Sequence, residues 1–136
     1  MPQNRGVLVS IPIDSPASIV HKTLEDFYSN APFIIILPIE EIPATQHVRG
    51  SNFCHIGVIS DHNKNKSVVI SVLDNLIKGS AGQAIQNANI MFDFDETSGL
   101  LESPIFPWMS KYNKKKIRIM FISFGMIVLT ITTIIL

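Results

Sequence analysis

The sequence of 136 residues contains a single cysteine, Cys54. One cysteine excludes an intrachain disulfide, and it also excludes the paired cysteines of a CxxC redox motif. The four histidines are scattered without the spacing of metal ligands, and the acidic stretch at residues 93–96 lacks the other positions of a calcium-binding loop. We therefore predict no metal site and no disulfide framework.

The sequence also lacks an excess of charge of either sign, with 11 basic and 11 acidic residues. The charges are unevenly placed, because residues 1–110 carry six Lys/Arg and eleven Asp/Glu, whereas residues 111–136 carry five Lys/Arg and no acid. An acidic body does not attract phosphate backbones, so we expect no nucleic-acid partner. The N-terminal apolar run is short and interrupted by Pro12, so we expect no signal peptide.

A long uncharged run, IMFISFGMIVLTITTIIL, occupies residues 119–136. As a helix it would be about 27 Å long, close to the hydrocarbon thickness of a bilayer. A basic cluster at residues 111–118 precedes it and would keep the body on the cytoplasmic side. The pattern predicts a basic linker and a transmembrane helix in residues 110–136, which makes the lipid bilayer an expected partner.

The rest of the chain is predicted to combine short strands with two helices. Apolar and β-branched runs predict strands at residues 6–13, 33–37, 52–60 and 67–74, and the polar cluster between the last two makes them a hairpin. Helical spacing of apolar residues predicts helices at 16–29 and 81–92. The order β-α-β-β-β-α, followed by coil at 93–109, indicates an α+β fold.

The same patterns predict which surfaces are buried. For the helix at 16–29, the stretch Asp14-Ser15-Pro16 supplies an N-cap candidate followed by proline as the first helical residue, and Phe27 is one of the apolar residues at helical spacing. The near-continuous apolar character of residues 67–74 predicts burial on both faces of that strand. In the helix at 81–92 the apolar residues share one face, and their small size predicts close packing of Ala81, Ala84, Ile85, Ala88, Met91 and Phe92.

One glycine-rich stretch is a candidate for anion binding. Lys78, Gly79, Ser80, Ala81 and Gly82 offer main-chain N–H groups at a helix N-terminus, where the helix dipole favours phosphate. The stretch is neither the Walker pattern nor a complete GxGxxG, and a glycine turn that merely begins a helix is the commoner structure. Both interpretations stay open on the residues alone.

Cys54 is a candidate nucleophile, which would need a base or a positive charge beside its thiolate. His55 is its neighbour in sequence, but adjacent residues of a strand point to opposite faces. A base would have to be His47 or His62, from a loop. The favoured interpretation is that Cys54 is a small buried hydrophobe.

Several motifs carry a resemblance to a known family. The segments VRGSNFCHIGV (48–58), VISVLDNLIKGSAGQAIQNANIMF (69–92) and DETSGLLESPIFP (95–107) resemble, in this order and spacing, the C-terminal part of N-acetyl-gamma-glutamyl-phosphate reductase. That family is related to the aspartate-semialdehyde and glyceraldehyde-phosphate dehydrogenases. The opening PQNRGVLVSIPI also resembles the family's P-x-x-RG strand, so the resemblance covers about residues 2–107 and roughly the last third of a family enzyme.

The resemblance implies that residues 1–109 are part of a mixed-sheet catalytic and dimerisation domain. Family enzymes are cytoplasmic oxidoreductases of arginine biosynthesis, which use NADPH to reduce an acyl phosphate to an aldehyde through a thioester on a cysteine. The resemblance places Arg49, Ser51 and Asn52 near the substrate. It places the following residues at the NADP end of the site: Asn75, Lys78, Gly79, Gly82 and Gln83.

The sequence departs from the family at the catalytic positions. The family's nucleophile lies in a Gly-Cys-Tyr context that is absent here, and Cys54 matches a noncatalytic cysteine. The family's histidine precedes the proline matched by Pro2, and its glycine-rich Rossmann domain also has no counterpart in these residues. Asp93 and Ser98 stand where the family usually has Gly and Thr. We therefore expect no catalytic residue in this chain and no activity from it alone.

Two interpretations of the whole chain remain. The residues after Pro107 have no counterpart in the family, so a membrane anchor fused to a reductase fragment would give a tail-anchored interaction module. Alternatively, the chain is a nonfunctional remnant of a damaged gene that is read past its normal stop. The expected protein partner is a separately encoded N-terminal reductase part or a second copy bound through the sheet.

Overall fold

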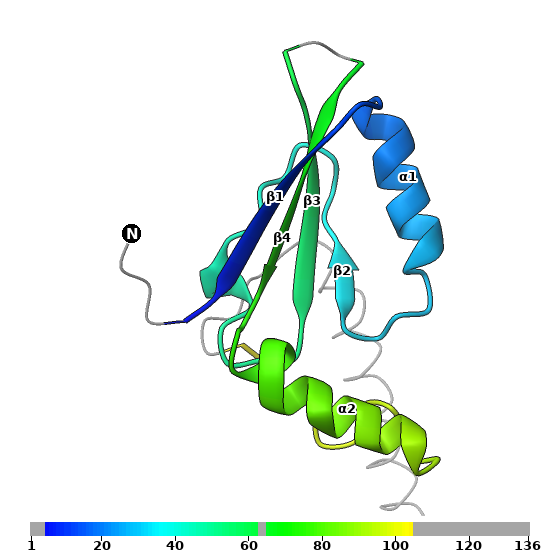
Figure 1. Cartoon of the computed structure of the whole chain (residues 1–136), viewed down its shortest axis with the longest axis vertical. Helices are drawn as coiled ribbons and strands as arrows, with labels where there is room; N and C mark the ends of the chain where they lie inside the picture. The colour runs from blue at the N-terminus through cyan, green and yellow to red at the C-terminus, as the bar shows by residue number, and fades with distance from the viewer. Residues whose placement is uncertain (1–4, 63–64, 105–136) are drawn as a thin grey trace, which may run out of the picture.

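A computed structural model describes residues 5–62 and 65–104 of the chain. These residues form one four-stranded sheet in the order β1-β4-β3-β2, with one helix beside the sheet and another across its end (Figure 1). The predicted β-α-β-β-β-α order and the α+β class are confirmed. The elements are β1 (Val7–Ile13), α1 (Ala17–Phe27), β2 (Ile34–Ile36), η1 (Thr45–His47), β3 (Cys54–Ser60), β4 (Ser67–Leu73), η2 (Ile77–Ala81) and α2 (Gly82–Met91).

The sheet is mixed. β3 and β4 form the predicted antiparallel hairpin, with Ser60 opposite Ser67, and β1 is antiparallel to β4 on the other side. β2 is parallel to β3, because the chain between them crosses from one end of the sheet to the other through the loop at residues 37–53. β1 and β2 are therefore the two edge strands.

Each face of the sheet has a different cover. The helix α1 packs most closely on β3 and also contacts β2 and β4. The loop before β3 covers the opposite face, where a Cβ added at Gly57 would meet the main-chain oxygen of Glu41 and the ring of Pro43. The apolar core lies between these covers and comprises Ala17, Phe33, Leu37, Val48, Cys54, Ile56, Val58, Val72 and Leu100.

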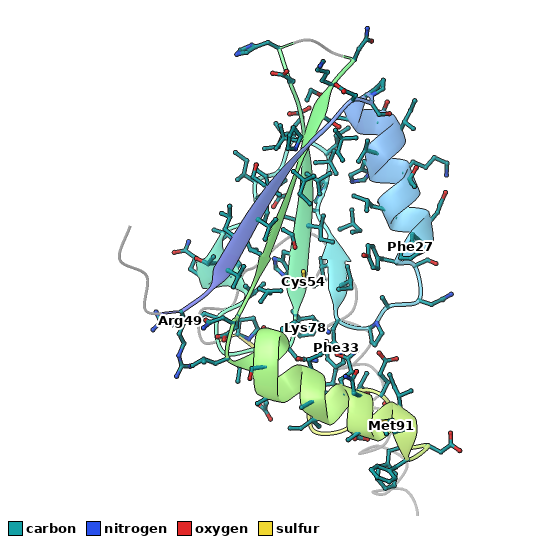
Figure 2. All side chains as sticks on the ribbon, in the orientation of Figure 1. Phe27, Phe33, Arg49, Cys54, Lys78 and Met91 are labelled. Carbon is teal, nitrogen blue, oxygen red and sulfur yellow. The ribbon has the colours of Figure 1, made fainter. Side chains whose placement is uncertain are left out.

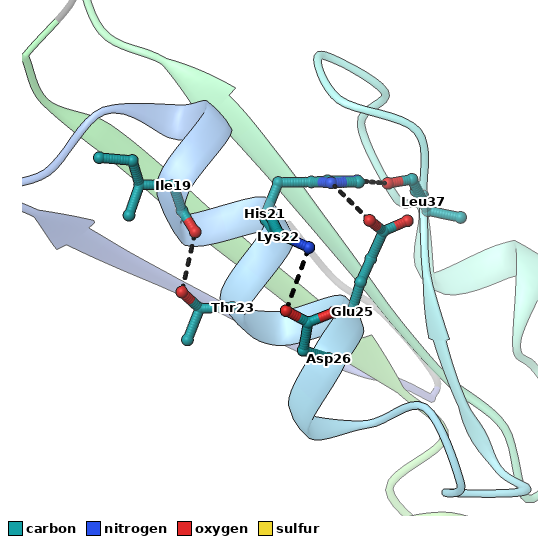
Figure 3. A network of polar contacts seen from close by, with 7 residues as sticks. All are labelled: Ile19, His21, Lys22, Thr23, Glu25, Asp26 and Leu37. Atoms are coloured by element: carbon teal, nitrogen blue, oxygen red, sulfur yellow. Dashed lines mark hydrogen bonds and ion pairs between the residues drawn. The ribbon is translucent and has the colours of Figure 1, made fainter.

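Polar contacts fix the position of α1. The Nε2 atom of His21 donates to the carbonyl of Leu37 at 2.8 Å, which ties the helix to the chain just after β2 (Figure 3). Its Nδ1 atom lies 3.4 Å from the carboxylate of Glu25, one turn later. A second pair on the helix joins Lys22 to Asp26 at 3.3 Å, but both side chains are exposed and so contribute little.

Two expectations for α1 are wrong. The helix begins at Ala17 with Pro16 as its N-cap, so neither Asp14 nor Ser15 caps it with a side chain; Asp14 pairs with Lys66 at 2.7 Å. Phe27 is 77% exposed. Tyr28, the next residue, takes the half-buried position, and the two rings pack edge to face with centroids 4.9 Å apart.

The expectation that β4 is buried on both faces is also wrong. Only Ser67 and Val72 of this strand are buried. The reason is that α1 packs most closely on β3 and reaches β4 only in part, so most residues of β4 are half-buried rather than buried. Every residue of β1 except Ile13 is exposed although the strand carries no charge.

The apolar face of α2 points away from the protein, which contradicts the expected close packing. The residues of α2 that are buried are Gly82, Gln86 and Asn89, whereas Ile85 is 47% exposed and Met91 79% exposed. Figure 2 shows Met91 at the end of the helix farthest from the sheet. Helical spacing identified the apolar face correctly, but polar contacts described below turn the other face inward.

The predicted linker and transmembrane helix, residues 110–136 and 119–136, lie outside the described residues. Among residues 5–62 and 65–104, no helix is both long and apolar enough to cross a membrane.

Candidate functional site

The candidate anion-binding stretch begins at Asp74, a fully buried residue at the end of β4. Its Oδ1 atom accepts the N–H groups of Leu76 at 2.8 Å and Ile77 at 3.1 Å, and its Oδ2 atom accepts that of Gly50 at 2.8 Å. Burial would raise the pKa of Asp74, but these donors and the charge of Arg5 outweigh it and lower the pKa. The carboxylate therefore caps the helical segment and anchors the loop before β3.

Internal hydrogen bonds occupy three main-chain N–H groups of the glycine-rich stretch. The N–H of Gly79 donates to the carbonyl of Asp74 at 2.9 Å, and that of Ala81 donates to Leu76 at 3.1 Å. The N–H of Gly82 is likewise bonded to the carbonyl of Ile77. The turn is thus a π-helical start of α2, and these three N–H groups are bonded to the protein's own carbonyls.

A polar network lies beneath α2 and is centred on Gln86. Its Oε1 atom accepts from Nζ of Lys78 at 2.6 Å and from Nδ2 of Asn52 at 3.1 Å, while its Nε2 atom donates to Glu96 at 2.6 Å. One turn later, the amide of Asn89 donates to the carbonyls of Glu96 and Ser98 at 3.3 and 3.0 Å. These bonds hold the polar face of α2 against the loop at residues 95–104.

Lys78 occupies the inner side of this network. Its amine lies 5.5 Å from the centre of the Phe33 ring, and Figure 2 shows both residues near Cys54. Burial lowers the pKa of Lys78, while the charges of Cys54 and Glu96 oppose the shift. The amine is therefore directed into the protein, toward Gln86.

Cys54 is a buried free thiol, as predicted. Its sulfur lies 3.3 Å from the hydroxyl of Ser71 on the neighbouring strand. Burial raises the pKa of the Cys54 thiol, against the hydrogen bond of Ser71 and the charge of Lys78. A thiol with a raised pKa is a poor nucleophile, because the thiolate is the reactive form.

His55 is not placed to serve Cys54 as a base. In β3, His55 points to the face opposite Cys54, where the loop before β3 lies. Burial, with a smaller contribution from the charge of His47, lowers the pKa of His55 to about 4. A buried, neutral imidazole at this position is a structural element of this face. The described residues contain no cluster of groups that could hold a metal ion.

The residues implied as substrate-proximal are brought together around the end of β3. Ser51 and Asn52 are buried, and the hydroxyl of Ser51 donates to the carbonyl of Val48 at 2.8 Å. The Oδ1 atom of Asn52 lies against Gly82, where an added Cβ would collide with it. The Nε atom of Arg49 is buried without a hydrogen-bond partner among the described residues.

The residues implied as cofactor-binding separate into two groups. Lys78 and Gly82 contact the network of Gln86 and Asn52 inside the protein. Gly79 is exposed, and the amide of Gln83 donates to Asn87 at 2.9 Å on the surface. Asn75 lies elsewhere, since its Oδ1 atom accepts the N–H of Gly6 at 2.8 Å and fixes the start of β1.

Sequence reasoning missed the residues that organise this site, namely Asp74, Gln86 and Glu96. The position of Asp74 directly before a helical stretch is a capping signal, and it was available in the sequence. Gln86 and Glu96 gave no such signal, because their roles depend on contacts with Lys78 and Asn52 that only the fold creates.

Comparisons with known proteins agree with this fold. Residues 1–75 match the family described as semialdehyde dehydrogenase, dimerisation domain. Two crystal structures of aspartate semialdehyde dehydrogenase II from Vibrio cholerae, one complexed with ASA, share the fold with a TM-score of 0.51 and 20–22% identity. The similarity covers 65% of this chain and 27–28% of theirs.

Two curated reductases share a higher sequence identity with this chain than these crystal structures do. The chain is 51% identical over 107 residues to N-acetyl-gamma-glutamyl-phosphate reductase of Roseobacter denitrificans, and 50% identical over 107 residues to that of Paracoccus denitrificans. In both cases the match covers 79% of this chain. The chain spans about a third of the length of these curated relatives, 31% in each case.

Proposed function

Because this chain belongs to the semialdehyde dehydrogenase family through its dimerisation domain, we propose that it supplies the C-terminal part of an N-acetyl-gamma-glutamyl-phosphate reductase. The proposal is supported by 51% identity over 107 residues to a protein of that name. The reaction would be the NADPH-dependent reduction of an acyl phosphate to an aldehyde, in arginine biosynthesis in the cytoplasm. The part formed by residues 1–109 would complete a catalytic and dimerisation domain.

The chain would have no turnover by itself. The observation that carries this proposal is the state of its only cysteine, Cys54. The thiol is buried, it is hydrogen-bonded to Ser71, and its pKa is raised. Thioester chemistry requires an accessible thiolate with a proton acceptor nearby. Cys54 has neither, so the nucleophile must come from another part of the reductase.

The residues present fit NADP only as one outer wall of its site. When bound, the cofactor supplies the hydride. Gly79 and Gln83 are at the surface and would contact it, whereas Lys78 and Gly82 would support that surface from inside through Gln86 and Asn52. Asn75 would contact the cofactor from its position beside the start of β1. Arg49, Ser51 and Asn52 would shape the neighbouring substrate side.

A chimeric enzyme tests this function. The 107 residues of the Roseobacter denitrificans reductase that match this chain would be replaced by the corresponding residues of this chain. We expect the chimera to reduce the acyl phosphate with NADPH, and the 136-residue chain alone to show no turnover. A folded but inactive chimera, or turnover by the chain alone, would contradict the proposal.

Two variants of the chimera test the cofactor wall. Gln83→Ala is expected to raise the KM for NADPH severalfold, because it removes a surface amide that would contact the cofactor. Asn87→Ala is a matched control, since it breaks the same Gln83–Asn87 hydrogen bond but leaves the Gln83 amide in place. Equal KM values for the two variants would remove Gln83 from the site.

We also propose that residues 110–136 form a basic linker and a single transmembrane helix at 119–136. The support is the uncharged 18-residue run and the basic cluster before it. The chain would then be a tail-anchored subunit whose body faces the cytoplasm. Recovery of the chain in the membrane pellet after alkaline carbonate extraction is the expected result, and complete release into the supernatant would contradict it.

The protein partners would be the N-terminal reductase part and a second copy of this chain. The description of the matching family as a dimerisation domain supports self-association through the sheet. The exposed residues of β1 are available for it.

A further inference from the structure

The edge strand β1 has no charged residue, and no segment among residues 5–62 and 65–104 covers it. Val9 is 44% exposed and Ile11 46% exposed, and Leu8 on the other face is 54% exposed. Edge strands of soluble proteins are normally protected by charges, bulges or covering segments. An uncharged edge that is exposed on both faces therefore indicates a surface that pairs with another strand.

The hydrogen-bond pattern of the sheet determines which groups this edge offers. The N–H of Asp61 donates to the carbonyl of Lys66, so in the β3–β4 register the even-numbered residues of β4 bond to β3. The odd-numbered residues of β4 then bond to β1, where they face Val7, Val9 and Ile11. The residues of β1 whose main-chain groups point outward are Leu8, Ser10 and Pro12.

The donors of this edge are limited at both ends. Pro12 has no N–H, as expected for proline at an edge position. Before the strand, the N–H of Gly6 is already bonded to Asn75 at 2.8 Å. Only Leu8 and Ser10 therefore offer both an N–H and a carbonyl to a neighbouring strand.

We propose that β1 pairs antiparallel with β1 of a second copy of this chain, centred on Val9. In that register Leu8 of one copy faces Ser10 of the other, and both residues exchange N–H and carbonyl groups. Pro12 then faces Gly6. The residue without an N–H, Pro12, and the residue whose N–H is already bonded to Asn75, Gly6, therefore fall in the same pair. The edge is self-complementary in this register, which makes a second copy the partner that it fits.

The side chains agree with this register. Val9 lies beside Val9 of the second copy, and Val7 lies beside Ile11, so the apolar stripe of Val7, Val9 and Ile11 continues across both copies. No like charges meet, because β1 has none. The pairing joins the two sheets into one and gives the self-association in the proposed function a defined surface.

Cysteine cross-linking tests the register. In the full chain with Cys54→Ala, purified in mild detergent because of its apolar tail, the variant Val9→Cys is expected to form a disulfide-linked dimer under mild oxidation. Its two Cα atoms would lie about 4.5 Å apart, as in a non-hydrogen-bonded antiparallel pair, which a disulfide can bridge.

Ile11→Cys is the matched control, because Ile11 lies on the same face and is equally exposed. In the proposed register its two copies are offset by about 13 Å at 3.4 Å per residue, too far for a disulfide. Mixing Val7→Cys with Ile11→Cys should cross-link the two different chains. Equal cross-linking of Val9→Cys and Ile11→Cys, or none by Val9→Cys, would overturn the proposal.

Ser10→Pro tests the hydrogen bonds. It removes an outward N–H that has no role within one copy, so the fold should be kept while the dimer dissociation constant rises at least tenfold. A folded Ser10→Pro variant with unchanged dimerisation would also overturn the pairing. These results are independent of reductase activity, which the chimera measures, so the proposed function and the β1 pairing can fail separately.

Discussion

At the scale of single residues, the contact between Gly82 and Asn52 is the tightest point of the candidate site. A Cβ at Gly82 would collide with Oδ1 of Asn52 and lie 2.8 Å from the carbonyl oxygen of Ile77. Gly82→Ala is therefore expected to lower the free energy of unfolding by about 1–3 kcal/mol, the usual cost of overpacking. Urea denaturation of the full chain measures it.

Gly79→Ala is the control for this prediction. Its Cβ would lie 3.3 Å from Cδ1 of Leu73, the end of a flexible side chain, and Gly79 is otherwise exposed. We expect a change within about 0.5 kcal/mol, as for ordinary surface substitutions. Equal destabilisation by both substitutions would show that the Asn52 contact does not decide the effect, because helix propensity favours alanine over glycine at both positions.

His55 predicts a pH dependence of stability. Its pKa is lowered from 6.5 to about 4 by burial and by His47, so the unfolded state binds more protons than the folded state between these values. Stability is therefore expected to be highest above pH 6.5 and to fall as the pH drops to 4, by at most about 3 kcal/mol.

Because the pKa of Asp74 is lowered, Asp74 changes the stability only below the ordinary pKa of 3.8. This pH range lies below the one in which His55 changes the stability. Above that value the Asp74 carboxylate is ionised and keeps its three main-chain donors. Unfolding of the wild type and of His55→Leu at pH 4.5 and 7.5 isolates the histidine. If the free energy of unfolding of the wild type changed no more between these pH values than that of His55→Leu, the prediction would be contradicted.

At the scale of secondary-structure elements, the end of α2 contains a strained residue. Asp93 has a φ of 58°, and the N–H of Phe94 reaches back to the carbonyl of Asn89 at 2.8 Å. This is the left-handed position after a helix, which glycine occupies at least cost. Asp93→Gly is expected to raise the free energy of unfolding by about 1 kcal/mol, as measured by thermal or urea unfolding.

Glu40 is a comparison for that prediction, because its φ of 67° is also left-handed. Its carboxylate, however, accepts the N–H of Ser60 at 3.0 Å and the hydroxyl of Ser60 at 2.5 Å. Glu40→Gly relieves the backbone but loses both bonds, so no stabilisation is expected. If Glu40→Gly stabilised the protein as much as Asp93→Gly, these bonds would have no net effect.

The elements themselves could be predicted from the sequence more fully than their surroundings. The hairpin and both helices follow from apolar spacing and turn residues, which are local signals. The orientation of α2 could not be predicted, because an apolar face is assumed to point inward, whereas Gln86 and Asn89 are held inside by Glu96, Lys78 and Asn52.

The candidate site shows the same limit. The resemblance pointed to Lys78 and Gly82, and they do lie together with Asn52. It also grouped Asn75 with them, whereas the structure uses its Oδ1 atom to hold Gly6. Side-chain direction at the end of a strand depends on tertiary contacts, which spacing in the sequence does not encode.

At the scale of the whole molecule, the described residues leave two apolar surfaces open. One is β1, and the other is the outer face of α2, continued by Phe92 and Phe94. The two surfaces belong to different elements, and the network around Gln86 prevents α2 from rotating to bury its own. Residues 1–110 are therefore expected to be marginally stable or to associate, since exposed apolar patches drive association.

Substitutions on the outer face of α2 test the role of this surface without changing the core. The double variant Ile85→Lys with Met91→Lys changes only exposed positions, so the full chain should keep its unfolding free energy within about 0.5 kcal/mol. It should also bind less of a hydrophobic dye and form fewer large aggregates. Light scattering and dye fluorescence measure both effects.

Gln86→Leu, in contrast, is expected to lower the free energy of unfolding, although it adds an apolar side chain to a buried position. It leaves the amine of Lys78, the amide of Asn52 and the carboxylate of Glu96 without their shared partner. Loss of partners from buried polar groups costs about 1–3 kcal/mol each, so Gln86→Leu should destabilise the protein by at least that amount. Destabilisation by the lysine pair together with tolerance of Gln86→Leu would mean that α2 lies with its apolar face inward. The sequence pattern alone would then have given the correct orientation.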